Sequence, residues 1–149
     1  MTHEDYMNQA LTLAREAAAH GEVPVGCVIV RDGKIIGRDR NRREEKQAVS
    51  SHAEMEAMAQ ANEALGSWRL EDCDLYVTLE PCPMCAGAIL NARVRRVFYG
   101  ARDRAMGACG GVLNLFMEDF PQHPALVGGV LAEECRAVLT DFFRQLRRI

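Results

Sequence analysis

The stretch that decides the fold of this chain reads Leu79-Glu80-Pro81-Cys82-Pro83-Met84-Cys85-Ala86-Gly87-Ala88. The alternating apolar residues before it, 74–79, predict a β-strand, and the small residues after Pro83 predict a helix over 83–91. Pro83 suits the first helical position because that position needs no amide hydrogen. Cys82 and Cys85 are therefore i and i+3 across the first helical turn, where both sulfur atoms can lie on one side.

About thirty residues upstream, His52-Ala53-Glu54 begins a second predicted helix, 51–65, which Gly66 ends. The N-terminus of a helix favours the thiolate form of a cysteine, which is the form that binds metals. His52, Cys82 and Cys85 together offer three ligands for a tetrahedral ion. Structural zinc sites close all four positions, whereas catalytic sites leave one position for water. The three ligands therefore predict a catalytic zinc site.

Two other interpretations of these residues remain open. Cys73 could complete a closed structural site, but it precedes the 74–79 strand, while the cysteine pair follows that strand. A strand of this length spans roughly 17 Å, so Cys73 and Cys82 are expected at its opposite ends. Glu54 could serve as a capping-box glutamate that bonds the backbone amide of Ser51, or it could carry protons at the metal.

Composition indicates one soluble globular domain over residues 1–149. Apolar residues make up 48% of the chain and charged residues 26%, and no apolar run is long enough to cross a membrane. The acidic N-terminus lacks the apolar core of a secretory signal, so a cytoplasmic location is expected. Apart from the pair in the quoted stretch, the cysteines have no recognisable spacing and are expected to be buried free thiols: Cys27, Cys73, Cys109 and Cys135.

The remaining pattern alternates strands with helices, which predicts an α/β layer fold with helices covering a mixed sheet. Asp32-Gly33 predicts a hairpin between the first two strands. The other expected helices are 4–20, 112–117 and 131–148; the other expected strands are 25–30, 34–38, 94–99 and 126–127; and residues 39–51 and 101–111 are expected loops.

Charge gives a mixed indication about nucleic acids. The formal net charge of −3 argues against them, but several arginines cluster, and the first cluster is Arg38, Arg40, Arg42 and Arg43. Solvated arginine runs are common, so charge alone does not predict RNA binding. In the last helix, Phe143 falls at the margin of the apolar stripe, beside Arg144. It can stack on a splayed base or lie at the rim of the core or of a dimer interface.

The His-x-Glu and Pro-Cys-x-x-Cys elements together resemble the signature of the zinc deaminases. Further segments make the whole chain similar to the bacterial tRNA-specific adenosine deaminases, in the cytidine-deaminase-like superfamily. These segments are Glu22-Val23-Pro24-Val25-Gly26, Leu75-Tyr76-Val77-Thr78, Tyr99-Gly100-Ala101-Arg102-Asp103 and Asp141-Phe142-Phe143-Arg144.

The resemblance implies a three-layer fold with a mixed five-stranded sheet flanked by helices. It implies a homodimer with one zinc ion per subunit, held by His52, Cys82 and Cys85. The implied reaction is hydrolytic deamination of adenosine to inosine at the wobble position, in the anticodon stem-loop of an arginine tRNA, with Glu54 as proton shuttle. Deamination of free guanine or cytosine and a non-catalytic, zinc-stabilised RNA-binding module are the competing functions.

The resemblance also assigns substrate contacts. It implies that Asn41 contacts the flipped base and that Asp103 meets a neighbouring ribose hydroxyl, which separates RNA from DNA. Taken alone, Asn41 reads as the cap of a turn, and Asp103 as an acid paired with Arg102 or Arg104. Residues 48–51 and 104–111 differ from the pattern that is frequent in the family, and both segments lie in loops that we expect to face RNA.

Overall fold

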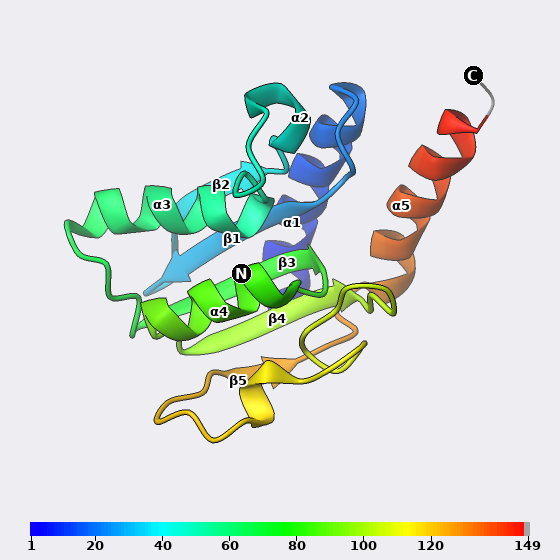
Figure 1. The fold of residues 1–149 in the computed structure, drawn as a ribbon. Helices are drawn as coiled ribbons and strands as arrows, with labels where there is room; N and C mark the ends of the chain where they lie inside the picture. Colours follow the sequence, from blue (N-terminus) through cyan, green and yellow to red (C-terminus); the bar gives the residue numbers. More distant parts are fainter. Residues whose placement is uncertain (148–149) are drawn as a thin grey trace.

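The computed structural model describes residues 1–147, which surround one mixed five-stranded sheet (Figure 1). The strands are β1 (Gly26–Arg31), β2 (Lys34–Arg40), β3 (Cys73–Leu79), β4 (Arg96–Ala101) and β5 (Ala125–Val127), in the order β2-β1-β3-β4-β5. Strand β1 is antiparallel to both neighbours, whereas β3, β4 and β5 are parallel. This arrangement confirms the predicted fold class.

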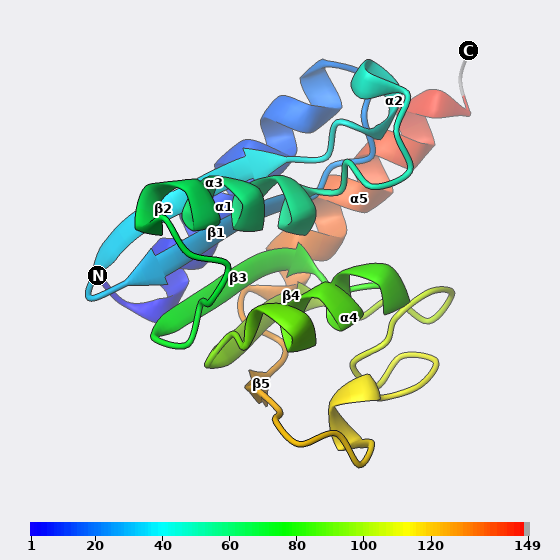
Figure 2. The same cartoon turned by 60° about the vertical axis from the view of Figure 1, so that its left-hand side comes forward.

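Helices cover both faces of the sheet, as Figures 1 and 2 show. They are α1 (His3–Ala19), α2 (Arg43–Lys46), α3 (Ala53–Leu65), α4 (Pro83–Ala92) and α5 (Ala132–Leu146), with a 3-10 turn, η1, at Leu115–Met117. Alternate strand side chains point to opposite faces. Cys27 and Ile29 of β1 therefore pack in the core beneath α3 and α4, while Val28 and Val30 pack in the core beneath α1 and α5.

Three element predictions need correction. The expected loop 39–51 contains α2, whose four residues are too few to show a helical period. The expected helix 112–117 is only the turn η1. Strand β4 begins at Arg96, two residues late, because Arg93 ends α4 in the left-handed conformation and the amide of Val94 bonds the carbonyl of Ile89. The predicted helix end at Arg148 lies outside the described residues.

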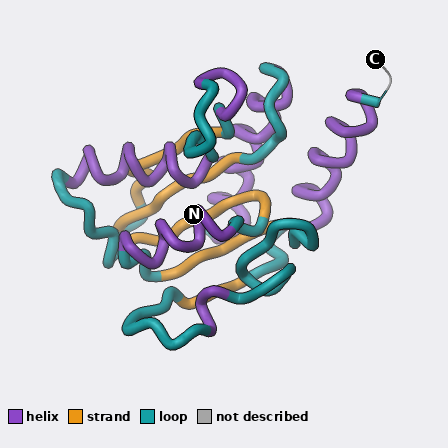
Figure 3. Tube along the Cα trace, in the orientation of Figure 1, coloured by secondary structure: helices purple, strands orange, loops and turns teal. Residues whose placement is uncertain are grey.

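Helix α3 packs closely on β2. A Cβ atom on Gly37 would lie 2.2 Å from the carbonyl oxygen of Ala57, so only glycine permits this approach. Helices α3 and α4 lie on the same face and start at the same end of the sheet, and the loops before α3 and after β4 gather at that end (Figure 3). None of the helices within residues 1–147 is long and apolar enough to cross a membrane.

Asp74, at the start of β3, provides a pH-dependent contribution to stability. Its carboxylate accepts hydrogen bonds from Arg95 Nε at 3.1 Å and Arg96 Nε at 2.9 Å. Burial raises the pKa of this carboxyl, but the hydrogen bonds from Arg96 and Arg95 outweigh burial and hold the pKa below its usual value. The stabilisation is therefore present above the unfolded-state pKa, about 3.9, and is lost as pH falls through the lower folded-state value.

We expect Asp74→Asn to lower the free energy of unfolding by about 1 kcal/mol near neutral pH, a modest loss because both arginines are half exposed. The difference from wild type should shrink in acid, once Asp74 is protonated. Urea denaturation at neutral and acidic pH measures both values. Asp72→Asn is the control, because Asp72 is exposed and lies 3.8 Å from Arg31. An equal loss at the two pH values would contradict the ion-pair explanation.

Candidate metal centre and active site

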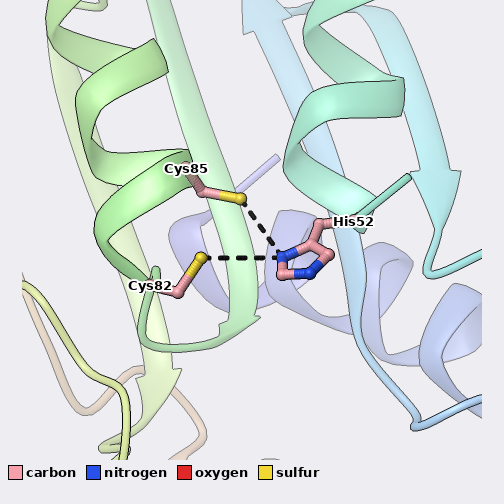
Figure 4. A group of neighbouring side chains, drawn as sticks. All are labelled: His52, Cys82 and Cys85. Carbon is pink, nitrogen blue, oxygen red and sulfur yellow. Dashed lines mark hydrogen bonds between the residues drawn. The ribbon is translucent and has the colours of Figure 1, made fainter. Parts of the chain in front are cut away.

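Three side chains converge between the starts of α3 and α4 (Figure 4). The Nδ1 atom of His52 lies 3.6 Å from the sulfur of Cys82 and 3.5 Å from the sulfur of Cys85. All three potential ligand atoms lie within 4.8 Å of one another. The structure thus brings together the three residues predicted as ligands, and it selects Nδ1 as the histidine atom that faces the sulfurs.

These distances fit a tetrahedral zinc ion. Bonds of 2.0–2.1 Å to nitrogen and 2.3 Å to sulfur, at a tetrahedral angle, separate the two ligand atoms by roughly 3.6 Å. The observed separations of 3.6 Å and 3.5 Å agree with that value. The donor set also suits zinc, because thiolate and imidazole ligands favour it over hard ions such as magnesium.

Backbone conformation explains why the two helix starts can share one centre. His52 and Cys82 are the N-cap residues of α3 and α4, and both have extended backbones, with φ −75°, ψ 156° and φ −77°, ψ 173°. An N-cap residue lies outside the helical geometry, so its side chain projects ahead of the helix. His52 and Glu54, two positions apart, can therefore reach the same centre, which a regular helix would prevent.

Cys73 does not belong to this centre, as the strand geometry predicted. It is the first residue of β3 and is paired with Arg31, whereas Cys82 follows the last residue of that strand, Leu79. Among the described residues, the metal-ligating group consists of His52, Cys82 and Cys85. The described residues therefore offer a metal ion three ligand atoms and not four.

The thiols of Cys82 and Cys85 differ in how readily they lose a proton. A hydrogen bond from Cys85 is the main cause that lowers the pKa of Cys82, to about 4; burial opposes the shift, and His52 adds to it. The same interaction with Cys82, together with burial, raises the pKa of Cys85. Cys82 is therefore ready as a thiolate, and a bound cation favours loss of the second proton as well.

Glu54 lies in α3 beside the ligand group, with 4% of its surface exposed. Burial raises the pKa of its carboxyl to about 7, and the charge of Cys82 adds to the shift. The capping-box interpretation is wrong: the N-cap is His52, and the Ser51 amide donates to the carbonyl of Ala48 at 3.2 Å. A carboxyl with a pKa near 7 can both accept and release a proton at neutral pH.

A pocket of about 420 Å³ opens onto His52, Glu54 and Cys82, within the size range of small-molecule sites. Asn41 and Asp103, both singled out from the sequence, line this pocket. Phe143 does not line it. That side chain is 42% exposed on α5 and packs edge-on against Phe142, with ring centroids 5.4 Å apart. The apolar stripe of the last helix was expected to reach Leu146. It stops earlier, because Leu146 is 54% exposed.

Asn41 is held by two hydrogen bonds to the backbone. Its Nδ2 donates to the carbonyl of Val23 at 3.2 Å, and its Oδ1 accepts from the amide of Arg43 at 3.1 Å. The turn-capping interpretation is thus correct for the free protein, although the side chain also lines the pocket. An asparagine amide has two donors and two acceptor sites, so one of each remains for a ligand.

Asp103 caps a turn and forms no ion pair in the described part of the chain. Its Oδ1 accepts from the amides of Ala105 at 2.9 Å and Met106 at 3.1 Å. Arg102 instead donates to the hydroxyl of Tyr99 at 3.0 Å. The alternative interpretation, an ion pair with Arg102 or Arg104, is therefore wrong, and the second carboxylate oxygen of Asp103 is available at the pocket.

Sequence reasoning missed other residues of this pocket. Arg43, Val49, Met84 and Met106 also line it, although sequence reasoning gave none of them a role in a pocket. Glu80 also lines it, and although it lies within the opening stretch, that stretch drew attention to its cysteines. A charged residue inside an apolar run was the available signal, because a buried glutamate requires polar partners.

The fold and the site define a deaminase of the cytidine-deaminase-like class. The family model of MafB19-like deaminases matches residues 1–147. The tRNA-specific adenosine deaminase of Bacillus subtilis is 49% identical over 150 residues, which cover 99% of this chain and 93% of that protein. This chain belongs to the tRNA-specific adenosine deaminase family.

Solved structures agree with this assignment. One, from a study of adenosine-to-inosine editing by tRNA deaminases at the wobble position, is 44% identical, with a TM-score of 0.88 over 91% of this chain and 99% of that chain. The guanine deaminase of Bacillus subtilis is also 44% identical, but its TM-score is 0.66 and the match covers 68% of this chain and 66% of that one.

We expect Cys85→Ala to abolish stable metal binding, because two ligands hold the ion far more weakly than three. Cys73→Ala should retain the metal content of the wild type, since Cys73 lies at the far end of β3. Elemental analysis of the purified proteins measures both contents. If Cys73→Ala loses its metal while its circular dichroism shows an intact fold, the interpretation as a closed structural site with Cys73 as fourth ligand would be correct.

Proposed function

We propose that this chain converts adenosine to inosine at the wobble position, in the anticodon stem-loop of an arginine tRNA. The observation that carries the proposal is the buried Glu54 beside His52, Cys82 and Cys85, at the base of an open pocket. A structural metal site has no need of a buried carboxyl with a raised pKa. The family relationship adds the substrate class, since the Bacillus subtilis relative is named for adenosine in tRNA.

We propose one zinc ion per subunit, held by Nδ1 of His52 and the sulfurs of Cys82 and Cys85. When bound, zinc supplies an activated water at neutral pH. Glu54 takes a proton from the attacking water, delivers it to the purine ring nitrogen and then assists the departure of ammonia. Its raised pKa suits this role, because the group must both gain and lose a proton in each turnover.

The pocket walls orient the base. Val49 and Leu79 contribute apolar surface, against which a flat purine can lie. The spare donor and acceptor of Asn41 face a base edge, and the second oxygen of Asp103 accepts a hydrogen bond from a ribose hydroxyl. A base in an unpaired loop can enter the pocket at little cost, because no base pair has to break.

Fewer arginines of the cluster are available to bind RNA than the sequence suggests. Arg40 forms an ion pair with Glu45 at 2.7 Å. Arg42 forms ion pairs with Asp39 and Glu45, both at 2.8 Å. Arg43 is exposed and lies at the pocket, where a guanidinium can contact a phosphate of the bound loop. Phe143 lies outside the pocket, and its exposed ring can stack on RNA there.

We also propose a homodimer and a cytoplasmic location. A groove of about 420 Å³ on the outer side of α3 and α4 is lined by Met55, Met58 and Trp68, and Trp68 is 52% exposed. Such an apolar surface fits a second copy of this face. Sedimentation equilibrium should give the mass of two chains.

The proposed cytoplasmic location is supported by the cysteines. The free cysteines of the described structure fit a reducing compartment.

The central test offers the wild-type protein a tRNA anticodon stem-loop and, separately, free guanine and cytosine. We expect inosine in the RNA and an equal amount of ammonia, with no turnover of the free bases. Chromatography of digested RNA measures inosine, and a coupled assay measures ammonia. Turnover of guanine without inosine would favour the free-base deaminase, and binding of RNA without either product would favour the non-catalytic module.

Glu54→Gln supplies the matched control for the chemistry, because it preserves the shape of the side chain and removes its proton exchange. We expect a loss of at least about 100-fold in kcat, the usual contribution of a general acid–base. Metal content and stem-loop affinity should stay at the wild-type values. Undiminished activity in this variant would remove Glu54 from the mechanism.

A further inference from the structure

Two buried carboxylates that are not among the candidate metal ligands, Glu22 and Glu80, hold the two loops that form the walls of the pocket. Glu22 is 1% exposed and Glu80 is 2% exposed. Neither forms an ion pair with a lysine or arginine in the described part of the chain. A buried charge requires strong hydrogen bonds in place of water. Backbone amides of the two loops supply these bonds.

Glu80 holds the wall formed by residues 103–111. Its Oε1 accepts from the amide of Asp103 at 3.0 Å, and its Oε2 accepts from the amides of Cys109 and Gly111, both at 2.8 Å. The loop therefore folds around one carboxylate at both of its ends. Asp103 and Met106, which line the pocket, lie on this loop.

Two glycines permit this arrangement. A Cβ atom at Gly107 would lie 2.3 Å from Oε2 of Glu80, and one at Gly111 would lie 2.7 Å from its Oε1. Both contacts are far shorter than van der Waals distances, so any other residue would push the loop off the carboxylate. The loop and Glu80 thus form one unit, whose parts are 23 to 31 residues apart in sequence.

Glu22 holds the opposite wall in the same way. Its Oε1 accepts from the amide of Glu44 at 3.0 Å, and its Oε2 accepts from the amide of Glu45 at 2.7 Å. The bond from Asn41 to the carbonyl of Val23 ties the same two segments together. This wall carries Asn41 and Arg43 to the pocket.

We propose that Glu22 and Glu80 are positioning residues, each of which fixes one wall of the pocket and thereby determines the affinity for the nucleotide substrate. The inference rests on the proposed function for the identity of that substrate. The metal ligands and Glu54 lie at the starts of α3 and α4, so the proton-transfer groups do not depend on these loops for their positions. Loops that are ordered before binding spare the entropy of ordering them on the substrate.

Glu22→Gln and Glu80→Gln test the proposal. In each variant an amide NH2 group replaces one acceptor oxygen and faces a backbone N–H, so at least one charge-assisted bond is lost. We expect the dissociation constant for a stem-loop, measured in a Glu54→Ala background, to rise about tenfold. In the otherwise wild-type background KM should rise by a similar factor, while kcat falls less than about threefold.

Hydrogen exchange locates the effect. Exchange should accelerate at the amides of residues 103, 109 and 111 in Glu80→Gln, and at those of residues 44 and 45 in Glu22→Gln, with each opposite wall unchanged. Glu63→Gln is the matched control, because Glu63 is exposed on α3. Metal content must equal that of the wild type, which excludes an indirect effect through the neighbouring Cys82.

The inference would be overturned by unchanged exchange at these amides, or by a fall in kcat with stem-loop affinity intact. A merely structural role would lower the melting temperature while leaving the affinity of the folded protein at the wild-type value, and this outcome also counts against positioning. Failure of the proposed function is a separate result. In that case the wild-type protein binds the stem-loop and forms no inosine. The exchange and affinity measurements still decide the role of the two glutamates.

Discussion

The site depends on one constraint: the starts of α3 and α4 lie side by side at one end of the sheet. His52 and Cys82 each precede the first turn of a helix in an extended conformation, so their side chains project into the gap between the two starts. The partial positive charge of both helix ends favours thiolates there. Glu54 is buried in the same gap, which raises its pKa. Ligand geometry and proton chemistry therefore have a single structural cause.

The long elements were predictable because each has a strong local pattern. The alternation before Pro81 and the proline at the start of α4 place β3 and α4 to within one residue. The failures were short elements that depend on distant contacts. Helix α2 has its first-turn amides bound by Glu22, more than twenty residues away, and periodicity cannot reveal such a bond. Strand β4 was placed early because Val94 belongs to the cap of the preceding helix.

The cluster of His52, Cys82 and Cys85 was likewise predictable, since its spacing limits the geometry, but the pocket walls were not. Arg40 and Arg42 stood out as members of a basic cluster, yet acidic residues within five positions draw them into internal ion pairs. Asp103 looked like the partner of a neighbouring arginine, yet it caps its own turn. In each case the competing interaction is local. Its outcome depends on the path of the loop, which the sequence alone does not specify.

The arrangement separates chemistry from recognition within a small protein. Secondary structure packed on the sheet holds His52, Cys82, Cys85 and the buried Glu54, whereas loops bound to Glu22 and Glu80 hold other residues that line the pocket. Exposed positions such as 104–106 can therefore change without disturbing the metal centre, because the buried carboxylate holds the loop through its backbone and not through those side chains. Gly107 and Gly111 have no such freedom, since a side chain at either position would occupy the space of the Glu80 carboxylate. The exposed side chains of this loop can thus change while the position of Asp103 at the pocket is preserved.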